Sequence, residues 1–105
     1  MASPPQSDAF KKAVVDSKKL TAKPSNDELL DLYALYKVSI GEDIGKAAAP
    51  SMFDLKGKAK KNAWQKVVDE GTTPEQAQEK YVALVESLKA SLGYDENKEP
   101  ETVGN

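Results

Sequence analysis

Apolar residues in the C-terminal third of the chain recur every three or four positions, which is the spacing of one face of a helix. Residues 73–76, TPEQ, begin this segment with threonine at an N-cap position, proline at the first helical position and glutamine where a capping box needs it. Gly93 follows the last apolar residue and is a natural stop. We therefore predict a helix from Thr73 to Gly93. Its apolar stripe consists of Ala77, Tyr81, Leu84, Val85, Leu88 and Leu92.

Two similar stripes occupy the first third of the chain. One predicts a helix from Ser7 to about Leu20, which ends there because Pro24 disfavours helical backbone at the residue before it. The other follows a capping box at residues 25–28, SNDE, and ends at Gly41. The first stripe is Phe10, Ala13, Val14, Ser17 and Leu20, and the second is Leu29, Leu32, Tyr33, Tyr36 and Ile40.

A fourth helix is predicted from an N-cap at Asp54 to about Glu70, before Gly71. Residues 42–53 lack a clear period and are predicted to form a long loop, which in a small domain is more often functional than accidental. Residues 1–6 are polar with two prolines and are predicted to be disordered, and residues 95–105 are predicted to be an acidic flexible tail. The pattern thus predicts an all-α four-helix bundle over residues 7–94.

The amino-acid composition narrows the range of possible functions. Among the 105 residues there is no cysteine and no histidine, which removes the sulfur nucleophile, the commonest general base and the commonest metal ligands. These absences favour a binding protein over an enzyme and predict no metal and no cofactor. All 15 basic residues are lysine, and the net charge is −2, so a nucleic-acid reader, which relies on arginine and a basic excess, is disfavoured.

The same features bear on location. No apolar run approaches the roughly 20 residues of a membrane span. The start, MASPPQSDAF, lacks the features of a secretory signal, and the chain has no cysteine, so we expect a reducing cytoplasmic compartment. The charge is unevenly divided, because residues 95–105 carry one lysine and four acids.

The motif YALYK, residues 33–37, places two tyrosines and a lysine on one side of the second predicted helix. On pattern alone, amphipathic core tyrosines with a solvated lysine are favoured by roughly two to one. In the alternative interpretation, the phenol rings stack on a purine, and the Lys37 ammonium meets a phosphate.

The stretch KGKAKKNAWQK, residues 56–66, carries five lysines and no acid. Such a run is usually a solvated face or a nonspecific contact for a polyanion. Lys56 and Lys60 lie one turn apart, and their repulsion costs a few tenths of a kcal/mol that a bound anion would relieve. Trp64 is predicted to be a core anchor between helices.

Together, YALYK, the stretch MFDLKGKAKKNAW at residues 52–64 and the helix EKYVALVESL at residues 79–88 resemble the acyl-CoA-binding protein family. The resemblance covers about residues 8–93. It implies a four-helix bundle of up-down-down-up order that binds long-chain acyl-CoA thioesters without catalysing a reaction. It therefore implies an intracellular acyl-CoA carrier and pool former with a role in fatty acid metabolism.

The resemblance also implies the site. Tyr33, Lys37 and Lys60 would hold the 3′-phosphate end of CoA, and Tyr36 and Tyr81 would lie near the nucleotide. The full implied set of acyl-CoA-binding residues is Lys18, Tyr33, Ala34, Leu35, Tyr36, Lys37, Lys56, Lys60 and Tyr81.

The chain departs from the family pattern at several positions. Lys61 stands where the family often has a second tryptophan, Val38 replaces a common glutamine, and Pro50-Ser51 replaces a common Pro-Gly. Two further interpretations stay open: a helical protein-interaction module without a small-molecule ligand, and a thioesterase, which the absent histidine and cysteine oppose. We expect a monomer without stable membrane insertion.

Overall fold

The structure is a computed structural model that describes residues 5–97. Residues 5–97 contain four α-helices and no strand, which confirms the predicted all-α class. A single 3-10 turn, η1, interrupts the predicted long loop. The elements are α1 (Asp8–Asp16), α2 (Asn26–Ser39), η1 (Ile44–Lys46), α3 (Leu55–Asp69) and α4 (Pro74–Leu92).

The starts of the helices follow local sequence signals. The Ser25 hydroxyl accepts from the Glu28 amide at 3.2 Å, and the Glu28 carboxylate accepts from the Ser25 amide at 2.8 Å. Thr73 and Gln76 form the same reciprocal pair at the start of α4. Because each box satisfies two amides that lack partners within the helix, both predicted starts are confirmed.

The end of α1 differs from the prediction, because the helix ends at Asp16 and not near Leu20. The chain after it pairs with the chain after α4: Leu20 and Tyr94 form an isolated antiparallel bridge, and the Asp95 amide donates to the Lys19 carbonyl at 3.1 Å. These tertiary bonds satisfy backbone groups that a further helical turn would otherwise use. Gly93 permits the close approach, because its φ is +85° and an added Cβ would collide with Thr21.

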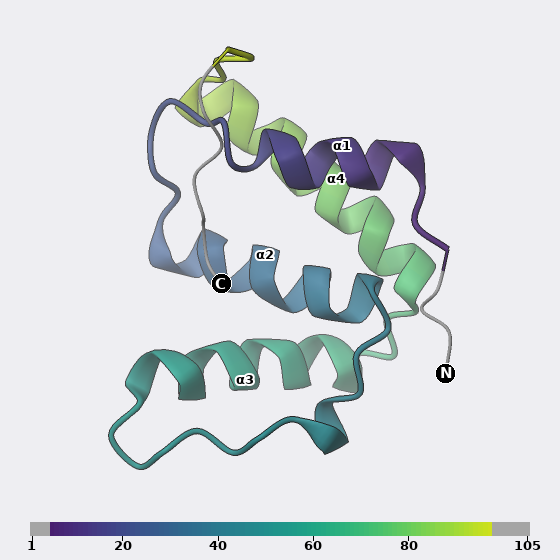
Figure 1. Cartoon of the computed structure of the whole chain (residues 1–105), viewed down its shortest axis with the longest axis vertical. Helices are drawn as coiled ribbons and strands as arrows, with labels where there is room; N and C mark the ends of the chain where they lie inside the picture. The colour runs from purple at the N-terminus through teal and green to yellow at the C-terminus, as the bar shows by residue number, and fades with distance from the viewer. Residues whose placement is uncertain (1–4, 98–105) are drawn as a thin grey trace.

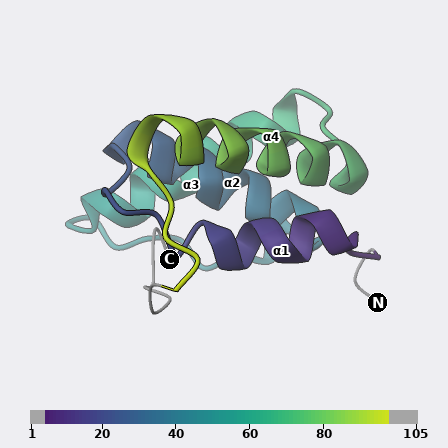
Figure 2. The same cartoon turned by 90° about the horizontal axis from the view of Figure 1, so that it is seen from above.

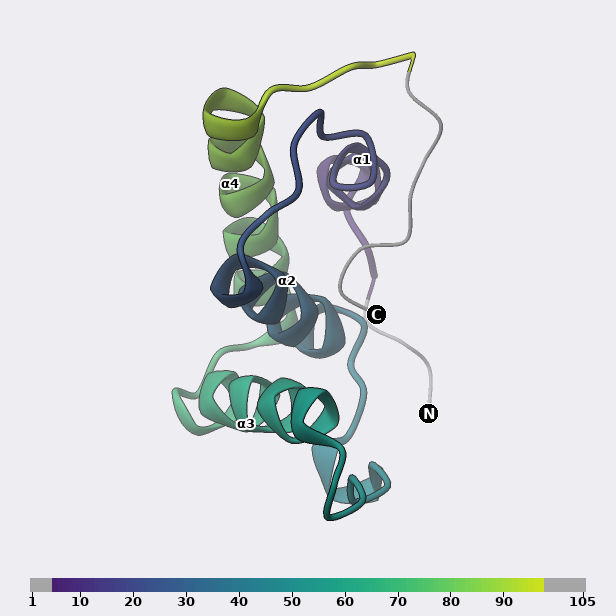
Figure 3. The same cartoon turned by 90° about the vertical axis from the view of Figure 1, so that its left-hand side faces the viewer.

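Helix α2 lies between α3 and α4, and α1 packs against α4 (Figures 1 and 3). The chain direction is the same in α2 and α3 and is reversed in α1 and α4, so the up-down-down-up order is confirmed (Figure 1). Seen from above, α1 and α4 run side by side (Figure 2). α1 meets α2 through side chains, and Phe10 stacks on Tyr36 with ring centroids 6.1 Å apart.

The core lies mainly between α1, α2 and α4. Phe10, Ala77 and Val85 have no exposed surface, and Trp64 of α3 is 4% exposed, which confirms its predicted place in the core. The stripe predicted for α2 is partly wrong, because α2 packs against α3 on one side and α4 on the other. Its buried residues are Leu32, Ala34, Leu35, Val38 and Ser39, whereas Leu29, Tyr33, Tyr36 and Ile40 are half-buried.

A buried carboxylate joins the C-terminal ends of α1 and α4. Asp16 is 4% exposed and receives Lys12 Nζ at 2.6 Å, Lys89 Nζ at 2.5 Å and the Tyr94 hydroxyl at 2.9 Å. Burial by itself would raise the pKa of Asp16, but hydrogen bonds from Lys12, Lys89 and Tyr94 lower it from 3.8 to about 2. We call Asp16 and these three partners the Asp16 cluster.

Both predicted terminal segments lie partly outside the described residues. Of the predicted disordered start, Pro5 and Gln6 are described, and the Pro5 carbonyl accepts from Gln78 Nε2 at 2.8 Å. Of the predicted acidic tail, residues 95–97 are described, and Lys19 Nζ donates to the Glu96 carbonyl at 3.1 Å. The predictions for residues 1–4 and 98–105 concern residues that the structure does not describe.

Candidate ligand-binding site

A lysine pair surrounds one tyrosine where α2 faces α3. Lys37 Nζ lies 5.5 Å and Lys60 Nζ 5.4 Å from the centroid of the Tyr33 ring. Lys37 Nζ is also 5.8 Å from the centroid of Trp64, whose ring meets Tyr33 edge to face. Two ammonium groups from different helices thus converge on one half-buried aromatic ring. Such an arrangement suits an anion that can neutralise both cations.

A pocket of about 390 Å³ adjoins this pair, between α3 and the segment that precedes it. One wall consists of small loop residues, and the opposite wall carries two lysine side chains and Trp64. The pocket therefore combines apolar surface with positive charge. It is lined by Tyr33, Ala47, Ala48, Ala49, Pro50, Ser51, Asp54, Gly57, Lys60, Lys61 and Trp64.

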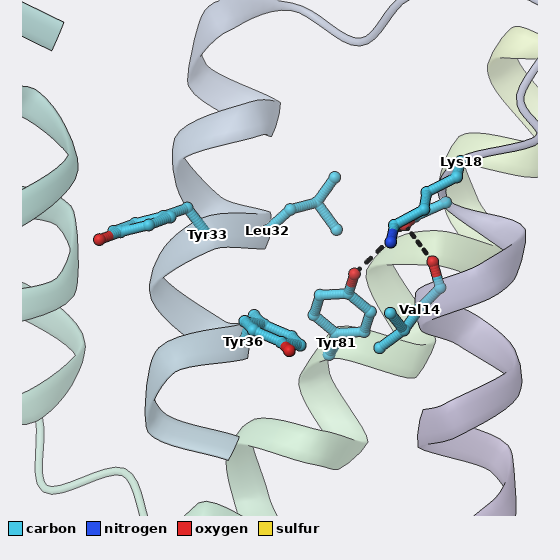
Figure 4. Close-up of a pocket in the computed structure, with 7 residues that line it drawn as sticks. Val14, Lys18, Leu32, Tyr33, Tyr36 and Tyr81 are labelled. Carbon is cyan, nitrogen blue, oxygen red and sulfur yellow. Dashed lines mark hydrogen bonds between the residues drawn. The ribbon is translucent and has the colours of Figure 1, made fainter. Parts of the chain in front are cut away.

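A second, smaller pocket of about 40 Å³ lies between α1, α2 and α4 (Figure 4). Lys18 lies at its edge, and Tyr36 and Tyr81 face it from α2 and α4. The Tyr81 hydroxyl contacts Ser17 Oγ at 3.3 Å, and burial raises the pKa of the Tyr81 phenol. Tyr33 lines both pockets and so connects the two parts of the site.

The sequence matches the family described as "Acyl CoA binding protein" over residues 7–85. The chain belongs to the acyl-CoA-binding protein family. It is 46% identical to an acyl-CoA-binding protein homolog of Manduca sexta over 80% of this chain and 91% of the relative. It is 48% identical to acyl-CoA-binding protein homolog 1 of Caenorhabditis elegans over 81% and 95%. The acyl-CoA-binding protein of Dictyostelium discoideum is 46% identical over 75% and 90%.

In this member of the acyl-CoA-binding protein family, most residues of the predicted site lie together. They face the two connected pockets from α2, α3, α4 and the segment after α1, with Lys37 joined to them through its contacts with Tyr33 and Trp64. The residues that the structure brings together are Lys18, Tyr33, Tyr36, Lys37, Lys60 and Tyr81.

Three predicted site residues lie elsewhere. Ala34 and Leu35 are 1% and 9% exposed and belong to the hydrophobic core. Successive helical residues are about 100° apart, so residues between Tyr33 and Tyr36 point to another side of α2. Their side chains therefore lie apart from the two pockets, and their role as ligand contacts stays a prediction. Lys56 is exposed and lines neither pocket.

One residue that sequence reasoning missed is Glu42. Its carboxylate lies 2.5 Å from Lys37 Nζ and partly neutralises that cation. Glu42 follows the end of α2, and the Glu42 amide donates to the Lys37 carbonyl at 3.1 Å. The five-residue separation matches no helical pair, so the available signal was an acid just beyond a helix that carries a lysine in its last turn.

Residues 5–97 contain no group of three or more acidic residues placed to bind a metal ion. No described helix combines the length and apolar character needed to cross a membrane. The site of this family member is thus built from aromatic rings, lysines and apolar walls.

Proposed function

We propose that this protein binds long-chain fatty acyl-CoA thioesters and acts as an acyl-CoA carrier and pool former. The observation that carries the proposal is the convergence of Lys37 and Lys60 on Tyr33 beside a pocket of about 390 Å³. An acyl-CoA presents both features that such a site matches, because it joins an apolar chain to a head with several phosphate charges. Family membership and the names of the relatives support the same ligand.

The two ends of the site suit the two ends of the CoA head. We assign the 3′-phosphate to Tyr33, Lys37 and Lys60, because two ammonium groups and a phenol supply charge-assisted hydrogen bonds. We assign the adenine to the neighbourhood of Lys18, Tyr36 and Tyr81, where half-buried Tyr36 offers an aromatic ring near the Lys18 ammonium. Lys56 lies on the same helix as Lys60 and would add long-range attraction to the anionic head.

The proposed role is binding without turnover. The chain has no histidine and no cysteine, and none of the site residues forms a nucleophile–base pair. We further propose that the protein acts as a monomer in the cytoplasm, without nucleic acid, cofactor or stable membrane insertion. The absence of cysteine supports the reducing compartment, and the absence of arginine and the net charge of −2 support the assignment without nucleic acid.

The proposal predicts that hexadecanoyl-CoA binds at least about tenfold more tightly than free CoA, because each buried methylene contributes about 0.8 kcal/mol. Titration calorimetry with both ligands measures this difference. Trp64 fluorescence provides a second measurement, since the ring contacts both Tyr33 and Lys37. Equal affinities would contradict an acyl site, and the absence of any binding would favour the protein-interaction module.

A second prediction concerns Glu42, which competes with a phosphate for Lys37. Glu42→Gln removes the competing charge, and we expect the affinity for hexadecanoyl-CoA to rise about two- to fivefold, in line with the modest strength of exposed ion pairs. Calorimetry at low ionic strength measures the gain, which should shrink in high salt.

Glu79→Gln is the control for Glu42→Gln, because it removes one exposed negative charge from α4. It should leave the affinity close to that of the wild type. If Glu79→Gln raises the affinity as much as Glu42→Gln does, the gain comes from net charge, and Lys37 is not a phosphate contact.

A further inference from the structure

Three large apolar side chains are exposed together immediately before and at the start of α3. Met52 is 74% exposed, Phe53 88% and Leu55 75%. The other exposed large apolar residues of the described chain, Val15 and Val68, are isolated and less exposed, at 45% and 38%. We call Met52, Phe53 and Leu55 the apolar tip.

Hydrogen bonds hold the apolar tip in a defined turn. The Asp54 amide donates to the Ser51 carbonyl at 3.1 Å, and Lys58 Nζ donates to the Met52 carbonyl at 2.7 Å. Asp54 also caps α3 by accepting from the Gly57 amide at 2.9 Å. The apolar side chains are therefore presented to solvent by an ordered backbone. A flexible loop does not explain their exposure, and an exposed apolar patch of this kind is typical of an interaction site.

The surroundings of the apolar tip are strongly basic. Residues 44–66 contain six lysines and one aspartate, for a net charge of +5, whereas the rest of the chain contains nine lysines and sixteen acids, for −7. Lys46, Lys56 and Lys58 are exposed. The apolar tip thus lies in a basic segment of an otherwise acidic chain, with Asp54 as the one acid of that segment.

We propose that the apolar tip docks on an anionic lipid bilayer, with the surrounding lysines facing the lipid headgroups. The segment between η1 and α3 runs along the edge of the molecule, on the far side of α3 from α1 (Figure 1). The tip residues are exposed, and exposed Lys46, Lys56 and Lys58 flank them in the sequence, a combination that complements an anionic surface. Apolar insertion combined with lysines near anionic headgroups is the usual chemistry of reversible interfacial binding. This inference goes beyond acyl-CoA binding and does not depend on it.

The test is co-sedimentation of the full chain with phosphatidylcholine vesicles, either pure or containing roughly 30% phosphatidylserine. We expect clear binding to the anionic vesicles, weak binding to the neutral ones, and loss of binding in about 0.5 M salt, where the Debye length becomes short. The Met52→Ser/Phe53→Ser variant should partition about tenfold or more weakly, because two apolar side chains no longer leave water. Val15→Ser, an exposed apolar residue on α1, is the matched control and should bind like the wild type.

Several results would overturn the proposal: no binding of the wild type to anionic vesicles, equal binding of the double-serine variant, or binding that ignores phosphatidylserine. A dimer in sedimentation that the double-serine variant abolishes would show that a second copy covers the tip. Calorimetry of the double-serine variant with hexadecanoyl-CoA distinguishes a failure of membrane docking from a failure of the proposed function. The double-serine variant should retain its affinity, and a parallel loss would place the tip in the ligand site and contradict docking.

Discussion

Lys60→Ala is expected to lower the affinity for hexadecanoyl-CoA about ten- to a hundredfold, the equivalent of one charge-assisted contact of roughly 1.5 to 3 kcal/mol. Lys60 is half-buried, lines the larger pocket and lies over the Tyr33 ring together with Lys37. A phosphate in this position would be partly shielded from water, which strengthens its attraction to the ammonium. Titration calorimetry measures the loss.

Lys58→Ala is the matched control, because Lys58 lies two residues before Lys60 and contacts the Met52 carbonyl instead of the site. The 3′-dephospho analogue of the ligand completes the experiment. In the wild type, removal of the 3′-phosphate should weaken binding, and in Lys60→Ala it should matter much less. If Lys58→Ala weakens binding as much as Lys60→Ala, the effect reflects general surface charge, and Lys60 does not contact the 3′-phosphate.

The fold was predictable from sequence wherever its cause is local. Both capping boxes act within four residues, so the starts of α2 and α4 can be read directly from the amino-acid sequence. The end of α1 was not predictable in this way. Leu20 leaves the helical path because its neighbours bond to residues 93–95, more than 70 positions away, and no local pattern reports that pairing.

The same distinction between local and long-range causes applies to the residues of the site. Tyr33, Tyr36 and Lys37 were identifiable because helical spacing places them near one another, and the structure connects them with Lys60. Ala34 and Leu35 belong to the same contiguous motif, and the turn of the helix places their side chains in the core, which sequence spacing from the tyrosines did not indicate. The loop wall at residues 47–51 has no period at all, so only its packing against α3 reveals it.

The Asp16 cluster makes stability depend on pH. The pKa of Asp16 in the folded protein is about 2, below its ordinary value of 3.8, so the unfolded chain binds the proton more tightly. The stabilisation is therefore fully present above about pH 5 and is lost as the pH falls through 3.8 toward 2. A shift of this size corresponds to about 2 kcal/mol, and the low exposure of the carboxylate limits screening by solvent.

Asp16→Asn tests this cluster directly. The amide keeps the shape of the carboxylate but removes the buried negative partner of Lys89, whose side chain is 15% exposed and keeps the longer contact with exposed Glu86 at 3.4 Å. We expect a loss of about 2 to 4 kcal/mol at pH 7, which lowers the melting temperature by about 10 °C or more. The variant should also lose less stability than the wild type between pH 5 and 2. Glu79→Gln, with an exposed side chain on α4, should leave both the melting temperature and its pH dependence nearly unchanged. Equal acid sensitivity of Asp16→Asn and the wild type would show that other carboxylates control the acid transition.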